Sequence, residues 1–407
     1  MSNVSTTTGP TPVRELLSGR FAWFFAGRTV DLAGSSMTTV ALSLAVLRAT
    51  GRATDLGVVL AANMVPNLVL LLVGGTVADR MSRRLLLISA NLASGALMAA
   101  MAAILISDAY SLTRFALLAF GNGVVAAFTS PALRGIVPEL VARHDLQRAN
   151  ALLSSSQNTV RILGPVVASI LVSTVGGGWA LAADALTFWL AALAFTRIPG
   201  ATRPPASGRP LWRDLADGWS VFRSMRWVVV MTVSFALINA FNVGPWNVLG
   251  PQVVTARDSA LGWGVVQAVR AAGLLVMSVV AVKLVLRLPL RDGRVWGTLA
   301  GLPLLALGLS GEAWVVAIAA FVGGLGFSVA AITWESTLQA SVPAESLSRV
   351  TAYDDLFSYL AIPLSQILAG PLAHASGAKE ICTICGVAYI AACLFPLLNK
   401  QVRTLEA

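Results

Sequence analysis

The chain alternates between long apolar runs and short polar segments, and the apolar runs have the length of membrane-spanning helices. A helix needs about twenty mostly apolar residues to cross a bilayer. Eight runs approach or exceed that length without an Asp, Glu, Lys or Arg: 56–78, 85–107, 115–133, 227–256, 295–311, 313–334, 356–378 and 381–399. Four more qualify if they may contain charge: 21–47, 149–173, 178–196 and 259–286. The pattern predicts an all-α membrane protein with twelve transmembrane helices.

The composition supports lipid as the main solvent of the folded chain. Of its 407 residues, 56% are hydrophobic and only 12% are charged, whereas a soluble globular protein carries roughly 25% charged residues. Residues 1–20 are polar and contain Arg14 and Arg20, with no short apolar core followed by a cleavage site. We therefore interpret them as a cytoplasmic tail and not as a signal peptide.

The positions of Lys and Arg predict the orientation of the helices. With the N-terminus placed inside, the inner loops and tails contain twenty basic residues. The outer side contains five: Arg48, Arg52, Arg114, Arg257 and Lys379. Basic residues accumulate in cytoplasmic loops, so we expect a multi-pass protein of the cell membrane with both termini cytoplasmic. The net charge of +10 then reflects topology and contact with the lipid bilayer, and we expect no nucleic-acid partner.

A long polar segment, 198–226, separates two halves with related sequences. The first half contains Val137-Pro138 and Arg148-Ala149-Asn150-Ala151, and the second contains Val342-Pro343 and Arg349-Val350-Thr351-Ala352. We predict a tail (1–20), a six-helix bundle (21–197), a linker (198–226), a second six-helix bundle (227–399) and a tail (400–407). In the linker, Trp212, Leu215, Trp219 and Phe222 share one helical face, which predicts an amphipathic helix at the inner membrane surface.

Residues 74–84 read Gly-Gly-Thr-Val-Ala-Asp-Arg-Met-Ser-Arg-Arg. This segment resembles the signature loop between the second and third helices of the major facilitator superfamily. The matching residues are Gly75, Asp79, Arg80, Arg83 and Arg84, whereas Ser82 stands where the family usually has glycine. The resemblance implies the major facilitator fold, in which two similar bundles enclose a site near the middle of the membrane.

The same resemblance implies a gate at the cytoplasmic end. An Asp at a helix end can accept hydrogen bonds from the exposed N–H groups of a facing helix start. In the family this facing helix is the eleventh, here near Asp354 and Asp355, which also offer partners for Arg80 or Arg83. The alternative is that these basic residues only hold the loop inside.

Finer resemblances point to a bacterial efflux branch that contains macrolide, multidrug and siderophore exporters. They lie in Val137-Pro138-Glu139-Leu140-Val141, in Leu347-Ser348-Arg349-Val350 and in Gly370-Pro371-Leu372. Gly164 and Pro165, preceded by Arg161, are similar to the Gly-Pro motif of antiporters. Leu117 occupies the place of an arginine that many drug–proton antiporters carry in the fourth helix.

We therefore expect a secondary transporter that exports amphipathic small molecules, such as an antibiotic, a drug or a secondary metabolite, by proton antiport. Siderophore export and nutrient uptake remain alternatives. A phosphate-binding loop needs Gly-Lys followed by Ser or Thr, and no lysine here follows a glycine. We expect no cofactor and a monomer. An enzyme would need clustered catalytic groups, which the sequence does not contain.

Charged residues inside the apolar runs are the candidate coupling sites. A charge at the centre of a membrane helix costs roughly 2.5–3.5 kcal/mol or more, so it must be paired or face a cavity. Asp31 and Asp184 are the proton-coupling candidates, and Arg28, Arg161 and Arg270 are the candidate charge partners. As alternatives, Asp31 forms a permanent structural pair and Asp184 anchors a helix. Arg270 either pairs across its bundle or attracts an anionic substrate group.

Polar and aromatic residues within the predicted helices are candidates for the walls of a substrate cavity: Asn63, Asn67, Gln157, Asn158, Asn239, Asn242, Trp246 and Gln267. Each of them alone is more typical of helix–helix hydrogen bonding. We interpret Glu335 as a gate or loop contact. Cys382 and Cys385 have the spacing of half a metal site but lack further ligands, so we expect no metal and interpret them as small packing residues.

Overall fold

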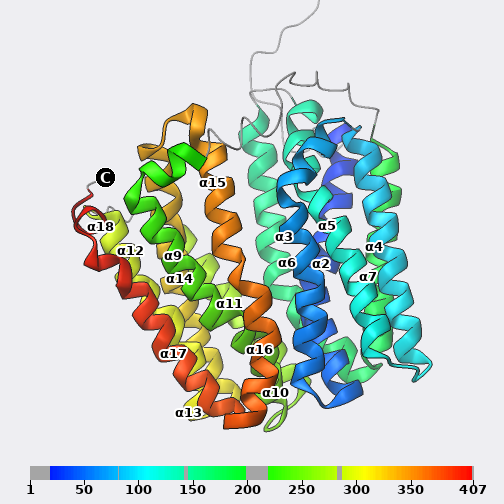
Figure 1. The fold of residues 1–407 in the computed structure, drawn as a ribbon. Helices are drawn as coiled ribbons and strands as arrows, with labels where there is room; N and C mark the ends of the chain where they lie inside the picture. The colour runs from blue at the N-terminus through cyan, green and yellow to red at the C-terminus, as the bar shows by residue number, and fades with distance from the viewer. Residues whose placement is uncertain (1–18, 81, 142–144, 199–218, 282–286, 406–407) are drawn as a thin grey trace, which may run out of the picture.

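The chain folds into long helices that stand roughly parallel to one another (Figure 1). The computed structural model describes residues 19–80, 82–141, 145–198, 219–281 and 287–405. Within this part of the chain, ten helical segments are long and apolar enough to cross a membrane. The more polar segment 146–174 and the interrupted segment 289–309 complete the expected twelve crossings. The predicted fold class is therefore confirmed.

The first bundle contains six uninterrupted helices: α2 (Arg20–Thr50), α3 (Ala53–Arg80), α4 (Arg83–Ile106), α5 (Leu112–Leu140), α6 (Leu146–Thr174) and α7 (Gly177–Thr196). We call it the N-bundle. Each helix of this bundle packs on its neighbours through buried apolar residues, for example Leu44, Met98 and Leu181. Leu186 and Leu193 of α7 are exposed, as expected for a surface that faces lipid.

The second bundle, or C-bundle, contains several interrupted crossing segments. Its elements are α9 (Arg226–Gly244), η2 (Pro245–Leu249), α10 (Gly250–Thr255), α11 (Ala260–Val280), α12 (Pro289–Gly297), η4 (Thr298–Gly301), α13 (Leu302–Leu309), α14 (Ala313–Ser341), α15 (Ala344–Tyr359), α16 (Ala361–Ser376), α17 (Ala378–Leu394) and η5 (Phe395–Leu398), followed by the short α18 (Lys400–Thr404). Proline begins or follows several of these breaks, because its ring removes a backbone donor and disturbs the preceding turn.

Helix boundaries differ from the apolar runs at one end of the bundles. The fourth predicted run ends at residue 133, but α5 continues to Leu140; the ninth begins at 295, but α12 begins at Pro289. We call the end at which residues 19 and 405 lie the tail end, and the opposite one the far end (Figure 1). At the tail end, α5 and α12 therefore extend beyond the apolar runs by turns that contain polar residues.

The described part of the predicted linker helix packs on protein. Residues 219–224 are helical, and Phe222 is buried against Tyr353 and Phe357 of α15. Trp219 contacts the same two rings and keeps 41% of its surface exposed. Trp212 and Leu215 lie outside the described residues. The apolar face expected at the membrane surface is thus partly used to cover α15.

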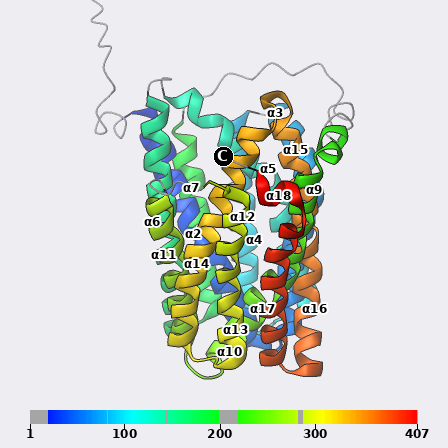
Figure 2. The same ribbon diagram turned by 90° about the vertical axis from the view of Figure 1, so that its left-hand side faces the viewer.

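The two bundles meet through glycines near the far end. A Cβ on Gly57 of α3 would lie 2.2 Å from the carbonyl oxygen of Gln366 in α16, and one on Gly370 would lie 2.5 Å from the Cα of Thr54. On the other side of the molecule α6 contacts α11 (Figure 2), where a Cβ on Gly264 would meet Ser169. Small residues let membrane helices approach closely. Toward the tail end, the bundles diverge in Figure 1.

We predict that Gly57→Ala opens the far end. The added methyl group would meet a backbone carbonyl, which cannot rotate away as a side chain does. Spin labels at Ala109→Cys and Ser376→Cys, exposed at the far ends of the two bundles, would report a longer inter-bundle distance in pulsed electron resonance. The native cysteines would first be replaced.

Gly121→Ala is the matched control for this substitution. Its new methyl group would approach only the flexible side chain of Leu97, at 3.3 Å and within the N-bundle. Its distance distribution should therefore remain that of the parent protein. A Gly57→Ala distribution indistinguishable from that of Gly121→Ala would contradict the role of Gly57 in closing the far end.

Candidate functional site

The first candidate site lies on the face of α2 that is turned toward the inside of the N-bundle. Arg28 and Asp31 form an ion pair through Nη1 and Oδ2. Their spacing of three residues places them on one helical face. Asp31 is 4% exposed, whereas the side chain of Arg28 keeps 23% of its surface exposed. The pair thus connects a buried carboxylate with a more accessible cation.

Asp184 of α7 contacts the same face of α2, one helical turn farther along that helix. Its Oδ2 accepts a hydrogen bond of 2.5 Å from the Thr38 hydroxyl. A Cβ on Gly34 would lie 2.6 Å from its Oδ1, so only glycine leaves room for the carboxylate. Asp184 is fully buried, and Oδ1 has no hydrogen-bond partner among the described residues.

Asp31, Gly34 and Thr38 follow each other at spacings of three and four residues, which place them on one face of α2. Since α2 rises about 1.5 Å per residue, Asp31 lies about 5 Å along the axis from the contact between Gly34 and Asp184. The N-bundle therefore holds two buried carboxylates near each other, one of them paired with Arg28 and the other bound to a hydroxyl group.

A cavity of about 390 Å³ opens beside Arg28, between α2, α5 and α6. We call it the N-bundle cavity. Gln157 and Asn150 of α6 line it together with Leu133 and Val137 of α5. The helices α2 and α6 are in contact, and Thr29 and Ser156 form a hydrogen bond of 2.7 Å between them. Arg161, in contrast, is exposed on α6 and has no ion pair with another described residue.

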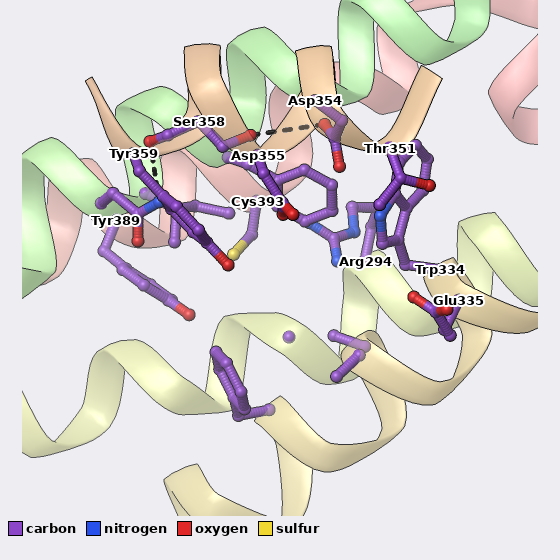
Figure 3. A pocket seen from close by; sticks show the side chains of 17 residues that line it. Arg294, Trp334, Glu335, Thr351, Asp354, Asp355, Ser358, Tyr359, Tyr389 and Cys393 are labelled. Atoms are coloured by element: carbon purple, nitrogen blue, oxygen red, sulfur yellow. Dashed lines mark hydrogen bonds between the residues drawn. The ribbon is translucent and has the colours of Figure 1, made fainter. Parts of the chain in front are cut away.

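A second cavity, of about 260 Å³, lies in the C-bundle between α9, α12, α14, α15 and α17. We call it the C-bundle cavity (Figure 3). Trp334 and Glu335 of α14 line one side, and Asp354 and Asp355 of α15 line another. Three of its helices, α9, α14 and α15, correspond in chain order to α2, α5 and α6, which line the N-bundle cavity.

Arg294 is the main residue of this cavity that sequence analysis missed. It is one of the twenty basic residues counted for the inner loops and tails, because the adjoining apolar run begins only at residue 295. The structure instead places Arg294 in the second turn of α12, where it is 2% exposed. A Cβ on Gly293 would lie 2.0 Å from Thr333 Oγ1, so this glycine brings α12 close to α14. The spacing of Gly293, Gly297 and Gly301 is the signal that would have extended the helix back past Arg294.

Asp354 and Asp355 of α15, which are named in the gate prediction, line the C-bundle cavity. Asp354 is buried and accepts hydrogen bonds of 2.6 Å from Thr232 of α9 and 3.3 Å from Ser358. Its carboxylate thus lies inside the C-bundle, and its contact with the signature loop stays a prediction. Asp355 lines the C-bundle cavity beside it (Figure 3).

The signature loop itself lies mostly outside the described side chains. This holds for Gly75, Asp79 and Arg80, whose gate role stays a prediction. Arg84 is described and donates a hydrogen bond of 2.5 Å to the carbonyl of Thr196 at the end of α7. Arg83 begins α4. The described part of the motif therefore joins α4 to α7 at the tail end.

Trp246 and Gln267 contact each other instead of lining either cavity. The indole N–H of Trp246 donates to Gln267 Oε1 at 2.9 Å, and its ring packs 4.9 Å from that of Trp263. The guanidinium of Arg270 lies 4.9 Å from the centre of the Trp246 ring. Of the two alternatives for Arg270, pairing with an acid is not observed among the described residues.

The remaining candidates divide between cavity walls and helix contacts. Asn239 lines the C-bundle cavity and donates to the carbonyl of Ser358 at 2.8 Å. Asn63 joins α3 to α5 through a hydrogen bond of 3.1 Å to the carbonyl of Ala119. A Cβ on Gly164 would lie 2.0 Å from Ser36 Oγ, so this glycine, followed by the buried Pro165, serves close packing of α6 on α2. Half-buried side chains without a described hydrogen bond are Asn67, Asn158 and Asn242.

Comparison with known proteins places most of the chain in one family. Residues 24–365 match the Major Facilitator Superfamily. The multidrug efflux pump Tap of Mycobacterium tuberculosis is 27% identical over 357 residues, which cover 85% of each chain. Tap of Mycolicibacterium fortuitum is 28% identical over 377 residues, or 87% of this chain and 88% of the relative. Macrolide efflux protein A of Streptococcus pyogenes is 25% identical over 237 residues, 58% of each chain.

Solved structures share the fold at low sequence identity. The nucleoside transporter NupG superposes with a TM-score of 0.74 at 11% identity, covering 93% of this chain and 98% of its own. A bacterial homologue of the human lysosomal transporter Spinster, in an inward-facing and unoccupied conformation, gives a TM-score of 0.69 at 13% identity and covers 97% of both chains. At these identities the likeness extends to the fold alone.

The contact between Thr38 and Asp184 predicts a measurable stabilisation of the N-bundle. Thr38→Val would leave both oxygens of a buried carboxylate without a hydrogen bond, so thermal unfolding in detergent should shift to lower temperature, by about 1 kcal/mol of stability. Thr38→Val combined with Asp184→Leu should recover most of the loss, because no unpaired polar group remains. Thr39→Val, at an exposed neighbouring position, is the control. A Thr38→Val protein that melts like the control would contradict the contact.

Proposed function

Because the chain belongs to the major facilitator superfamily, we propose that it exports amphipathic small molecules, such as antibiotics or secondary metabolites, in exchange for protons. Membership in this family makes it a multi-pass membrane transporter. The direction of transport, the class of substrate and the coupling ion are the parts that we propose.

The efflux relatives support export. Two of them are named as multidrug pumps and one as a macrolide efflux protein, and the Tap relatives align with more than four fifths of this chain. Alignment at this length includes residues of both bundles. An exporter must accept its substrate from the cytoplasm or the inner leaflet of the membrane.

The observation that carries the coupling proposal is the Arg28–Asp31 pair beside the N-bundle cavity. Burial disfavours a charged carboxylate, whereas a neighbouring guanidinium favours it. When the bundles move, this balance changes, and the carboxylate can take up or release a proton. Asp184, one turn away and with one oxygen unpartnered among the described residues, is the second proton site.

In this proposal both termini lie in the cytoplasm of the cell, and the far end faces outward. The glycine contacts then close the outer side, so the described conformation is the one that exposes its sites to the cytoplasm. In the opposite conformation Asp79 of the signature loop meets the start of α15 and closes the inner side. The rigid bundles rock about the contacts between them, as expected for parallel repeats.

A drug-susceptibility panel on cells with and without the gene tests the export proposal. We expect the minimum inhibitory concentration of at least one amphipathic antibiotic to rise when the gene is expressed, and the rise to vanish when a protonophore collapses the proton gradient. Loss of siderophore secretion under iron limitation without any drug phenotype would show siderophore export instead. Gradient-dependent accumulation of a labelled nutrient would show uptake.

Asp31→Asn tests the proton site directly. Asn has nearly the shape of Asp but cannot exchange a proton near neutral pH. In proteoliposomes with an imposed pH gradient, we expect uphill substrate movement to be lost while downhill exchange continues. Asp108→Asn, at an exposed position outside the helices, is the control and should transport like the parent protein.

A structural role for Asp31 gives a different result. Removing the acid would leave Arg28 without its counter-ion inside the bundle, which is strongly destabilising. Expression would then fall and would recover in the double variant Arg28→Gln/Asp31→Asn. A well-expressed Asp31→Asn protein that still transports uphill would refute coupling through Asp31.

A further inference from the structure

The guanidinium of Arg294 is a buried cation that forms no ion pair with a described acid. The residue is 2% exposed, and its Nη1 has no hydrogen-bond partner among the described residues. No described acid lies within ion-pair distance of it. A charge in such a place costs several kcal/mol unless something else compensates it. A site with this cost is most simply explained by a ligand that supplies the missing negative charge.

Asp354, one of the acids that line the same cavity, is held by other groups. Asp354 accepts hydrogen bonds from Thr232 and from Ser358 through the same oxygen, Oδ1. These hydroxyl groups hold the carboxylate toward α9. Figure 3 shows Arg294 among the side chains that line the C-bundle cavity, between Thr351 and Asp355. The cation therefore belongs to the wall of the cavity and not to an ion pair within the bundle.

Aromatic rings form much of the remaining wall. Phe235 lies 4.8 Å from the Arg294 guanidinium and packs edge-on against Trp334, with 5.0 Å between ring centres. Phe327 and Tyr389 line the same cavity. Flat apolar walls of this kind fit an aromatic ring. The volume of about 260 Å³ has room for a fused two-ring system but not for a large macrocycle.

The charges around the opening restrict the anion. Glu335 is exposed at the cavity and accepts a hydrogen bond from Gln339, and Asp355 lines the cavity as well. These acids repel every anion, and they repel a multiply charged one such as phosphate more strongly than a singly charged one, because the repulsion grows with charge. A single carboxylate, in contrast, matches the planar fork of one guanidinium.

From these observations we propose that the C-bundle cavity is a substrate subsite that binds an aromatic ring carrying one carboxylate-like anion, with Arg294 as the anion-binding residue. The inference rests on the proposed function in that it names the substrate class of the same transporter. It assigns substrate recognition to the C-bundle and leaves proton exchange to the N-bundle. Binding of the ligand supplies the counter-charge that Arg294 lacks in the empty cavity.

The test compares two probes of the same shape and different charge, 2-naphthoate and 2-naphthamide. Equilibrium dialysis with purified protein in lipid nanodiscs, corrected with empty nanodiscs, measures their affinities without any ion gradient. We expect 2-naphthoate to bind about tenfold to a hundredfold more tightly, as a charged hydrogen-bonded pair does relative to a neutral one. Arg294→Gln should remove this preference by weakening naphthoate and leaving naphthamide near its original affinity.

Arg291→Gln is the matched control. Arg291 lies on the same helix, is exposed and pairs with Asp292 at 2.9 Å, so its loss should leave the preference unchanged. Arg294→Lys keeps a charge but not the planar fork, and its preference should be intermediate. If Arg294→Gln does not fold, the lysine variant decides. An unchanged preference in Arg294→Lys would then overturn the assignment.

The assignment of Arg294 as the anion-binding residue would also be overturned by two other results. One is equal affinity of the parent protein for both probes, and the other is a preference for naphthoate that survives Arg294→Gln. These results are separable from those of the export proposal, because binding needs no gradient and no drug phenotype. A protein that exports drugs but binds both probes equally refutes only the subsite. A protein that binds naphthoate through Arg294 but confers no resistance refutes only export.

Discussion

The hydrocarbon interior of a membrane does not solvate charge, and this constraint explains where the polar groups of this protein lie. Asp31 is held by Arg28, and Asp184 by Thr38, on one face of α2. Asp354 is held by Thr232 and Ser358. Each acid is turned inward, away from the apolar surface that lipid covers. Arg294 departs from this pattern, since no described acid lies within ion-pair distance of it, and it lines a cavity.

The same constraint applies to the backbone, because an unpaired peptide group in hydrocarbon is costly. The crossing segment α9–η2–α10 breaks at Pro245. There the hydroxyl of Ser365 accepts from the N–H of Gly244 at 2.9 Å and donates to the carbonyl of Ala240 at 2.6 Å. The serine hydroxyl thus bridges the backbone donor of residue 244 and the backbone acceptor of residue 240. These two backbone groups of the irregular helix thereby have a hydrogen-bond partner inside the C-bundle. The described helices of the N-bundle have no such break.

The sequence predicts the fold well because hydropathy and the number of crossings follow directly from burial in lipid. The predicted pairing of Asp31 with Arg28 also follows from local spacing. Arg294 and Asp354 show where this reasoning stops. A hydropathy pattern assigns a charge at the edge of an apolar run to the loop, and only the tertiary approach of α12 to α14, through Gly293, shows that Arg294 is buried. Likewise, nothing local to Asp354 indicates Thr232, which is 122 residues away.

In the proposed mechanism the two kinds of site lie in different bundles, and this separation has a consequence for coupling. A ligand shifts a conformational equilibrium only by its difference in affinity for the two states. A proton on Asp31 and an anion on Arg294 both change the charge enclosed by a bundle, but they do so without touching each other. Coupling between the two sites must therefore pass through the contacts between the bundles, such as those of Gly57 with α16 and of Gly264 with α6 at the far end. Glycine at these positions lets the two bundles approach closely, so these contacts are where a change of charge in one bundle can act on the other.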